Sequence, residues 1–555
     1  MRLLIVTEKC GTEDAQRDGG ARLVTTLQRV FGEAARVMQF GDTTDPSAWQ
    51  HYTYPYGHGE RFTRRLANAE FIAKRVREVA ADFTHVLFVH ISMQFGLAEQ
   101  PLHGPQTWTF PMFLTPSYTA AGEAVPAAYT AAERRVLTGT GRILTPSHQE
   151  REQLLGVYGV GWQRIRVVPR GIDTRALRPR VRTLDGPPRL VSVGSIKRQK
   201  NTLGLLRLFA RIRARFRGAS LRIIGPVQNS AYASEVYAEV ERLGLCNAVE
   251  FAGHVPPSEL GAKLDDHHIH LSTSSCETFG RSIFETLAAG LPNVGPASGN
   301  AASRYLAHLP SARFVDDDAA AIESVHELLT DLPSFSAAAC EVGELFDDDV
   351  LGRLLAAEVA ESDVLAVADY DGTIFHKDDS ERTRRCAQAF HRFGHKVVCS
   401  ARAVPDILDG LRRFKVEADW IIGCSGGVVT DGAGRTLWTT PLAADHAARL
   451  AQMAGSRLVK HAEDVLQVAL PAEARPADII HRAEVYQGTA FVGPRRASKL
   501  HALVRLLRHS RWHGRVRAFG DGPHDQEFLQ YFDGTRISAG GTNPQLRQAA
   551  EIEHE

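Results

Sequence analysis

The stretch SSCETFGRSIFETLAAGLP, residues 274–292, holds two glutamates eight positions apart with a glycine between them. A helical run begins around Phe279, so Glu277 lies in a loop and Glu285 lies about two turns into the helix, near the same face. Such a pair can bind sugar and ribose hydroxyls while the backbone amides between them face a diphosphate. The alternative is a solvated glutamate in a first helical turn followed by a surface glutamate.

The composition bounds the size and class of the protein. At 555 residues the chain is too long for one core, and domain-size statistics favour three or four units. Its 44% hydrophobic and 23% charged residues are ordinary for a globular protein. The chain has 65 Lys and Arg against 64 Asp and Glu. It therefore has no overall excess of positive charge that would indicate binding to nucleic acid or an anionic membrane.

Cysteine usage and hydropathy favour a cytoplasmic protein. The seven cysteines are scattered and contain no CxxC pair, which argues against a disulfide framework or a zinc site. The N-terminal MRLLIVTEKCG has too short an apolar run for a signal peptide. No run approaches the roughly 18 apolar residues that span a bilayer. We expect no membrane insertion and no nucleic-acid partner, and the pattern favours no particular oligomeric state.

Short apolar runs alternate with long stretches of helical period along the whole chain. Such alternation predicts parallel sheets covered by helices on both faces. The expected strands fall into three sets: RLLIV (2–6), HVLFVH (85–90), RILTPS (142–147) and IRVVPRG (165–171); RLVSVG (189–194), LRIIG (221–225), VEFAG (249–253) and HIHLSTS (268–274); VLAVADYDG (364–372), KVVCSAR (396–402), WIIGCSGG (420–427) and VRAFGDG (516–522).

Composition shifts place the joints between these sets. RPRVRTLDGPP (178–188) is charged and ends in Gly-Pro-Pro, as linkers do. An acidic, Ala-rich segment precedes the third set and favours a helix. We therefore predict α/β domains at 1–180, 186–345 and 362–555, with a linker helix at 346–361 and an inserted cap at about 430–490.

A glycine pair follows the first expected strand. Gly19 and Gly20 precede the helical run ARLVTTLQRVF. Glycines before a helix let backbone N–H groups approach a phosphate, and the helix dipole favours the anion. A plain glycine loop after a strand is the common alternative.

Four stretches in order resemble one enzyme family. VVPRGIDTRALRP (167–179), VGSIKRQKN (193–201), FAGHVPPSEL (251–260) and ETFGRSIFE (277–285) are similar to the retaining, two-Rossmann-domain glycosyltransferases that include sucrose-phosphate synthase. The resemblance covers about residues 1–345 and includes the family's E-x7-E motif. It implies a GT-B type fold, with an acceptor-side domain at 1–180 and a nucleotide-sugar-binding domain at 186–345.

The resemblance also implies roles for individual residues. Glu277 would lie near the transferred sugar, Glu285 would hold the donor ribose, and Lys200 would neutralise the departing diphosphate without a metal. The implied donor and phosphate-binding set is Gly19, Gly20, Arg198, Lys200, Thr278, Phe279, Gly280 and Glu285.

Two positions depart from the family pattern. Ser195 follows Gly194 where the family usually has an arginine, and Arg198 or Arg170 could replace that cation. Ser117 stands where a family histidine is expected, and His90 is another polar candidate in the same cleft.

The stretch VLAVADYDGTIF (364–375) places Asp369 and Asp371 at the end of an expected buried strand. Residues at i and i+2 share a face of an extended chain, so both carboxylates can point into one crevice. One can attack a phosphoryl group and the other can protonate the leaving oxygen. A calcium loop of EF-hand type is excluded, because Ser380 stands where that loop needs its final glutamate.

The last third of the chain, about 362–545, resembles the haloacid-dehalogenase-like phosphatases. The resemblance implies a nucleophile (Asp369), an acid/base (Asp371), a phosphoryl-binding serine in CSAR (Ser400) and a lysine in ASKL (Lys499). Mg²⁺ would be held by Asp369, Asp371, Asp521 and Asp525. His524 departs from the asparagine of many members, and the cap would lie between Arg402 and Lys499 as in sugar-phosphate phosphatases.

Together the two resemblances predict a bifunctional enzyme. The first two domains would transfer a sugar, with retention, from a nucleotide sugar to a phosphorylated sugar or cyclitol acceptor, and the last would remove that phosphate. Two alternatives stay open: the phosphatase acts on an unrelated metabolite, or one half is a degenerate regulatory or binding module.

Overall fold

The computed structural model describes residues 1–11, 18–41, 45–56, 60–139, 141–476, 480–486 and 488–536. The chain divides into two compact units, Met1–Ala360 and Glu361–Glu555. Part of the polar loop before Gly19 (12–17) and the end of the expected last domain (537–555) lie outside the described residues.

The first unit begins with a seven-stranded parallel sheet in the order β3-β2-β1-β4-β5-β6-β7. Its interior strand β1 (LLIVT) is wholly buried and apolar up to its final threonine, as expected for a strand covered on both faces. The strands are β1 Leu3–Thr7, β2 Ala35–Phe40, β3 Gln50–Tyr52, β4 His85–Val89, β5 Gln106–Phe110, β6 Arg142–Thr145 and β7 Ile165–Val167. The helices are α2 Gly19–Phe31, α3 Arg61–Ala67, α4 Ala69–Ala80, α5 Thr115–Ala120, α6 Ala127–Thr138 and α7 His148–Gly156.

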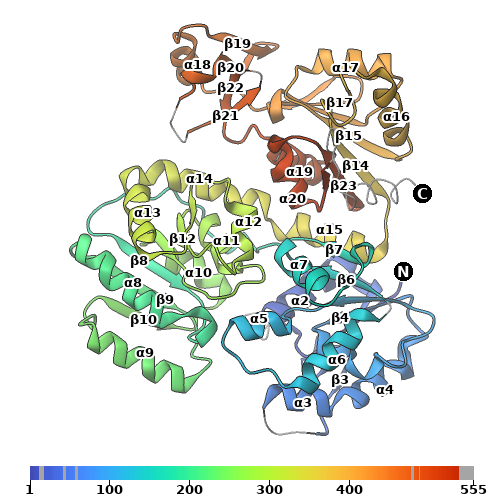
Figure 1. Ribbon diagram of the computed structural model, residues 1–555, viewed down its shortest axis with the longest axis vertical. Coiled ribbons are helices and arrows are strands. Elements are labelled where there is room, and N and C mark those ends of the chain that lie inside the picture. The colour runs from blue at the N-terminus through green and yellow to red at the C-terminus, as the bar shows by residue number, and fades with distance from the viewer. Residues whose placement is uncertain are drawn as a thin grey trace. The chain divides into compact units, whose positions relative to one another are not determined.

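A six-stranded parallel sheet follows, in the order β10-β9-β8-β11-β12-β13. Figure 1 shows the two sheets of this unit as separate layers, each with its own helices. The strands are β8 Arg189–Val193, β9 Ser220–Ile224, β10 Val249–Gly253, β11 Ile269–Leu271, β12 Asn293–Gly295 and β13 Ala312–Phe314. The helices are α8 Thr202–Arg215, α9 Ser230–Arg242, α10 Pro257–Leu264, α11 Arg281–Ala288, α12 Ala301–Leu306, α13 Asp318–Thr330 and α14 Leu332–Leu345.

The expected linker helix is present as α15, Asp348–Ala360, and it packs on the first layer. Asp348 accepts a hydrogen bond from Thr26 Oγ1 of α2 at 2.8 Å and pairs with Arg29 at 2.8 Å. Gly352 lies against the same helix, because a Cβ there would be 2.7 Å from Thr26 Cγ2. The chain thus returns to its first layer before the second unit begins.

The second unit contains a mixed seven-stranded sheet in the order β18-β17-β16-β15-β14-β23-β24. Its five strands from β16 to β24 are parallel, whereas β17 and β18 are antiparallel. The strands are β14 Val364–Asp369, β15 His395–Cys399, β16 Trp420–Gly423, β17 Val428–Asp431, β18 Thr436–Thr439, β23 Arg515–Gly520 and β24 Thr535–Arg536. The helices are α16 Ser380–His391, α17 Val404–Arg413, α19 Lys499–His509 and α20 Gln526–Tyr531.

A separate antiparallel sheet, β19-β20-β22-β21, is inserted between β18 and α19. Its strands are β19 Arg457–His461, β20 Asp464–Pro471, β21 His481–Tyr486 and β22 Thr489–Pro494, and helix α18 (Ala444–Ala451) packs on it. The inserted cap was predicted to begin at about residue 430. The insertion begins later, after β18, because β17 and β18 extend the main sheet.

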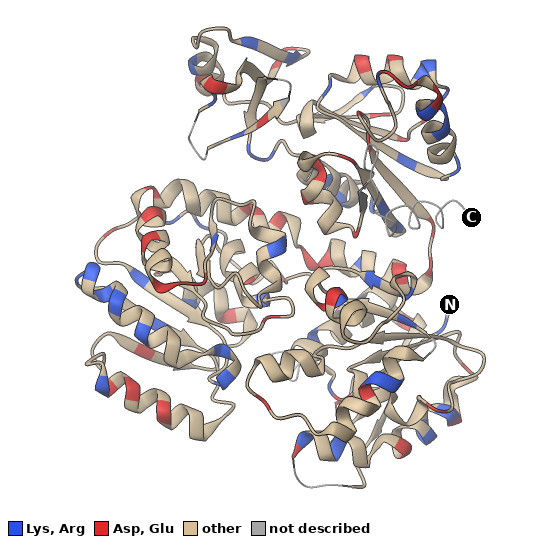
Figure 2. Ribbon diagram, in the orientation of Figure 1, with Lys and Arg blue, Asp and Glu red and all other residues tan. Residues whose placement is uncertain are grey.

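Charged residues of both signs are interspersed along the described chain (Figure 2), in keeping with its near-zero net charge. Among the helices that the structure describes, none is long and apolar enough to cross a membrane.

Candidate active sites

The loop before α11 joins Glu277 to Lys200. Lys200 Nζ forms an ion pair with Glu277 Oε1, and both side chains are mostly buried. Burial alone would raise the pKa of Glu277, but the charge of Lys200 outweighs it and holds that pKa below its ordinary value. Gly194 leaves room for this lysine, since a Cβ there would lie 3.2 Å from Lys200 Cε. The structure thus brings together the residue predicted to lie near the transferred sugar and the residue predicted to neutralise the departing diphosphate.

Glu285 lies in the second turn of α11 and reaches the first layer. Its Oε1 is 2.9 Å from Arg22 Nη1 of α2. Helix α11 starts two residues later than predicted, because Gly280 adopts a left-handed conformation with φ 85° that ends the preceding loop. Glu277 therefore stays in the loop and Glu285 in the helix, as the sequence predicted.

Gly19 and Gly20 are the first residues of α2, not a loop ahead of it. Asp18 caps the helix by accepting hydrogen bonds from Gly20 N at 2.8 Å and Ala21 N at 3.1 Å. Arg170 donates to the carbonyl of Gly19, and a Cβ on Gly19 would lie 3.2 Å from Arg170 Nη1. A glycine at this position leaves space for the guanidinium.

Sequence reasoning missed three cations around these glutamates: Arg22, Lys197 and Arg281. Burial and the charge of Arg22 lower the pKa of Arg281 to about 10. Burial and the charge of Lys200 lower the pKa of Lys197 to about 8. Arg281 and Lys197 lie inside the quoted motifs ETFGRSIFE and VGSIKRQKN. Their positive charge within these motifs could have identified them as candidates for binding a phosphate.

The other predicted donor-site residues differ in what their side chains contact. Arg198 forms an exposed ion pair with Glu235 at 2.6 Å, so it is not brought to Glu277. The side chain of Phe279 is buried and stacks on Phe284, which leaves only its backbone for a ligand. Thr278, between Glu277 and Phe279, is half-buried.

The two polar candidates of the first layer are held by their neighbours. Ser117 is buried and donates to Gln153 Oε1 at 3.3 Å. His90 has a positive φ of 87°, its Nδ1 accepts from Ser92 N at 3.2 Å, and burial lowers its pKa to about 3. His90 is therefore a neutral imidazole.

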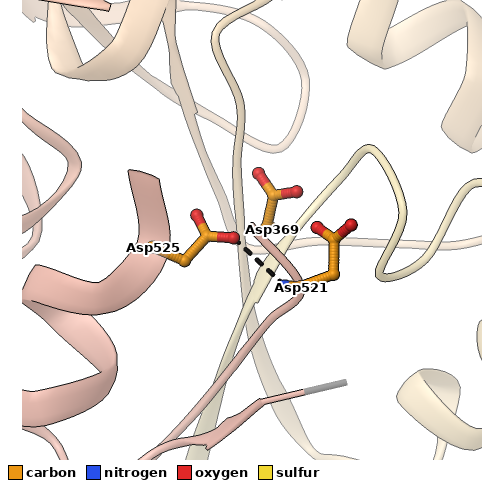
Figure 3. A group of neighbouring side chains, drawn as sticks. All are labelled: Asp369, Asp521 and Asp525. Carbon is orange, nitrogen blue, oxygen red and sulfur yellow. Dashed lines mark hydrogen bonds between the residues drawn. The ribbon is translucent and has the colours of Figure 1, made fainter. Parts of the chain in front are cut away.

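The second unit gathers three aspartates at the carboxyl edge of its main sheet (Figure 3). Asp369 ends β14, Asp521 follows β23, and Asp525 lies in the turn before α20. One carboxylate oxygen of each lies within 4.8 Å of the others. Asp525 Oδ2 accepts from the backbone nitrogens of Asp521 at 3.1 Å and Gly522 at 3.0 Å, which fixes its orientation.

Lys499, the first residue of α19, completes this group. Its Nζ is 2.6 Å from Asp369 Oδ1 and 2.7 Å from Asp525 Oδ1. Burial alone would lower the pKa of Lys499, but the two carboxylates raise it, so it is charged. Burial and the neighbouring carboxylates raise the pKa of Asp369, and Lys499 only partly offsets them.

Asp371 does not join the three aspartates. Arg402 holds it in a two-pronged ion pair, with Nη2 to Oδ1 at 2.6 Å and Nε to Oδ2 at 2.8 Å. Ser400 Oγ lies 3.4 Å from Asp371 Oδ2, so Ser400 is at the same edge. Arg402 belongs to the quoted CSAR but was not singled out from the sequence.

The DYDG turn needs its glycine. Gly372 has a φ of 80°, and a Cβ there would lie 2.0 Å from Asp521 Oδ2. Only glycine lets Asp521 approach the turn that carries Asp369 and Asp371.

The inserted sheet reaches this edge through β21. Glu484 accepts from Ser425 Oγ, and Ser425 N donates to the carbonyl of Ser400 at 2.9 Å. Arg482 links Glu484, at 3.1 Å, to Glu527 at 2.9 Å, two residues after Asp525. These contacts place the inserted sheet beside the aspartates.

The donor set fits a hard divalent cation. Lys499 pairs with two of the three carboxylates, so the group carries two uncompensated formal negative charges, and oxygen ligands suit Mg²⁺. Asp369, Asp521 and Asp525 are the residues that would hold it.

Two family models match the first unit. Residues 18–176 match "Glycosyltransferase Family 4" and residues 173–335 match "Glycosyl transferases group 1". The matches end before the aspartate cluster, so the phosphatase resemblance of 362–545 stays a prediction.

Individual relatives agree with these matches. D-inositol 3-phosphate glycosyltransferase of Nocardia farcinica is 28% identical over 186 residues, covering 31% of this chain and 41% of that protein. The chain thus spans about two fifths of that relative's length. Alpha-monoglucosyldiacylglycerol synthase of Streptococcus pneumoniae is 27% identical over 328 residues, covering 54% of this chain and 71% of that protein.

A solved structure shares the fold. Sucrose-phosphate synthase from Thermosynechococcus elongatus superposes with a TM-score of 0.57 at 17% identity, covering 65% of this chain and 99% of that one. The two parallel sheets of the first unit have the GT-B arrangement that the sequence predicted. Residues 18–335 of this chain therefore belong to the group 1 and family 4 glycosyltransferases.

Proposed function

We propose that the protein is a bifunctional enzyme that makes a phosphorylated glycoside and then removes its phosphate. The first unit transfers a sugar, with retention, from a nucleotide sugar to a phosphorylated sugar or cyclitol. The second unit hydrolyses the phosphate ester with the help of Mg²⁺. The observation that carries the proposal is the buried Lys499–Asp369 pair in the same chain as a glycosyltransferase.

The names of the relatives favour a phosphorylated acceptor. The Nocardia farcinica relative is named for inositol 3-phosphate, and the solved structure of similar fold is a sucrose-phosphate synthase. An acceptor that keeps its phosphate through sugar transfer leaves a phosphate ester in the product. That ester is the substrate that a phosphatase in the same chain requires.

In the transfer step, the bond between the sugar and the diphosphate breaks and negative charge grows on the departing diphosphate. Lys200 lies beside Glu277, where a fixed cation stabilises that charge in the transition state. Glu277 faces the transferred sugar from the same loop. Glu285 binds the ribose hydroxyls, and the amides at the start of α11 point toward the phosphates.

In the hydrolysis step, Asp369 attacks the phosphorus, forming an aspartyl phosphate as the ester P–O bond breaks. The leaving oxygen takes a proton from Asp371. Water then attacks the aspartyl phosphate, with Asp371 accepting its proton, and inorganic phosphate leaves. Lys499 and Ser400 bind phosphoryl oxygens, and a bound Mg²⁺ would neutralise charge on the phosphoryl group.

For this chemistry Asp371 must leave Arg402. In the free protein two guanidinium nitrogens donate hydrogen bonds to this carboxylate. A phosphoryl group bound beside Ser400 offers Arg402 a stronger anion. Asp371 is then free to act on the leaving oxygen.

Phosphate release that depends on both substrates tests the proposal. The full chain is incubated with Mg²⁺ and a matrix of nucleotide sugars and sugar or cyclitol phosphates, and inorganic phosphate is measured. We expect release only from mixtures in which glycosyl transfer occurs. Equal release from an acceptor phosphate alone would instead favour a phosphatase that serves an unrelated metabolite.

A further inference from the structure

An ion pair joins the two sheets of the first unit at the proposed ribose site. Arg22 Nη1 of α2 lies 2.9 Å from Glu285 Oε1 of α11, and the side chains are 25% and 11% exposed. Glu285 is the carboxylate that the proposed donor ribose needs. In the free protein this acceptor is therefore already occupied by a cation of the opposite layer.

Two more guanidiniums lie around this pair without a carboxylate of their own. Within the described parts of the chain, neither Arg170 nor Arg281 forms an ion pair with a carboxylate, and Arg170 instead donates to the Gly19 carbonyl. Burial, with the charges of Arg281 and Arg22, lowers the pKa of Arg170 well below its ordinary value. Three half-buried cations therefore lie close together at Glu285, and Asp348 and Asp18 are the other carboxylates whose charges act on Arg170 and Arg281.

We propose that Arg22 occupies Glu285 in the free protein and transfers to the phosphoryl groups of the bound nucleotide, which frees Glu285 for the ribose. This inference rests on the proposed nucleotide-sugar site and adds a partner exchange to it. Arg170 and Arg281 bind the same diphosphate. They replace the positive charge of the family's arginine, at whose position this chain has Ser195.

The exchange has a thermodynamic consequence. A nucleoside without phosphates must displace Arg22 from Glu285 and offers it no other anion. A diphosphate without a ribose must also draw Arg22 away, leaving Glu285 buried and unpaired. A nucleoside diphosphate satisfies both residues at once. The two halves of the nucleotide therefore bind cooperatively, and each half alone binds poorly.

Affinities of the full chain for the intact nucleotide and its parts test this exchange. UDP, ADP and GDP are titrated calorimetrically, and the tightest of them is compared with its own nucleoside and with inorganic pyrophosphate. Arg22→Gln should weaken the nucleoside diphosphate about 10- to 100-fold, as loss of a charged hydrogen bond does. The same variant should tighten the nucleoside about three- to tenfold.

Glu285→Gln provides the reciprocal arm. It releases Arg22, so pyrophosphate should bind about three- to tenfold tighter although the nucleoside diphosphate binds more weakly. Arg170→Gln and Arg281→Gln should each weaken pyrophosphate about tenfold. Arg215→Gln is the control, because it removes an exposed ion pair with Glu323 outside this group and should leave each affinity within about twofold.

The outcomes separate this inference from the proposed function. Nucleoside diphosphates that bind wild type and Arg22→Gln equally would overturn the exchange and leave the donor site standing. The exchange also fails if Arg22→Gln weakens nucleoside and diphosphate by one factor, or if it binds the nucleoside no more tightly than wild type does. Failure of UDP, ADP and GDP to bind wild type would overturn the donor site itself.

Discussion

Lys499 Nζ lies 2.6 Å from Asp369 Oδ1, and both side chains are buried at the carboxyl edge of the second unit's main sheet. The lysine is the first residue of α19 and the aspartate is the last of β14, so two elements 130 positions apart meet at one charge pair. Burying these groups is costly unless they stay paired. Under the proposed function, this buried pair beside Asp521 and Asp525 serves phosphoryl transfer.

Replacing this lysine tests its role. Lys499→Met should lower phosphate release at least about a thousandfold, because Asp369 and Asp525 would face each other without their shared cation. Glycosyl transfer should be unchanged. Initial rates of both steps are measured on the same preparation. Lys460→Met, at an exposed position of β19, is the control, and a variant at 499 that keeps normal phosphate release would exclude the lysine from catalysis.

Chelation should separate the two activities. The surplus of two negative charges around Asp369, Asp521 and Asp525 predicts that phosphate release is abolished by EDTA and restored by Mg²⁺. Glycosyl transfer should continue in EDTA, since the proposed transfer uses side-chain cations. Both products are quantified in parallel. Transfer that stops with chelation would contradict the metal-free first step.

Gly372 should tolerate no side chain. In Gly372→Ala the methyl group would lie 2.0 Å from Asp521 Oδ2, and the left-handed φ of 80° costs about 1–2 kcal/mol for alanine. We expect a lower melting temperature and at least about a tenfold loss of phosphate release. Gly394→Ala is the matched control, because no atom lies within 4 Å of its Cβ position. Equal behaviour of the two variants would show that the turn is not constrained as described.

Buried Glu150 should make stability depend on pH. Burial raises its pKa to about 8, so the folded protein holds a proton that the unfolded chain releases near pH 4.3. Its contribution to stability is complete below that pH and declines as the pH rises toward 8. Glu150→Gln, which cannot ionise, should therefore melt roughly 3–10 °C above wild type at pH 8 and close to it at pH 5.

The control for this pH effect is on the same helix. Glu152 is exposed and pairs with Arg304 at 2.5 Å, so Glu152→Gln should show no rise in relative stability from pH 5 to 8. Calorimetric melting curves at several pH values measure both variants. A flat difference between wild type and Glu150→Gln would show that Glu150 ionises normally in the folded protein.

The sequence predicted part of each parallel sheet and missed the remaining strands. Each quoted apolar run has a counterpart, from β1 to β23, because a strand covered on both faces is an unbroken apolar segment. The quoted runs did not include β2, β3, β5, β12, β13, β17 to β22 or β24, although β2, β5 and β12 lie inside their sheets. Several of these strands, such as β5 (QTWTF) and β18 (TLWT), mix polar with apolar residues. The period of the sequence holds no signal for such strands.

The spacing within one motif predicted where Glu277 and Glu285 lie. It gave no information on contacts between segments that are far apart in the sequence. Glu277 and Glu285 could be placed from the motif that contains them. Their partners Lys200 and Arg22 come from other elements, and of these only Lys200 was foreseen, through family resemblance. Asp371 likewise shares a turn with Asp369, yet Arg402 draws its side chain away from the other aspartates. Which cation pairs with which carboxylate depends on where the charged groups lie in the folded structure.

The most direct test of the two-step account is mass spectrometry of the products made by Asp369→Asn. The variant, wild type and the matrix of nucleotide sugars and sugar or cyclitol phosphates are incubated with Mg²⁺. We predict that wild type yields a glycoside without phosphate, whereas Asp369→Asn accumulates the same glycoside carrying one phosphate. Release of the dephosphorylated glycoside by Asp369→Asn at the wild-type rate would contradict the account.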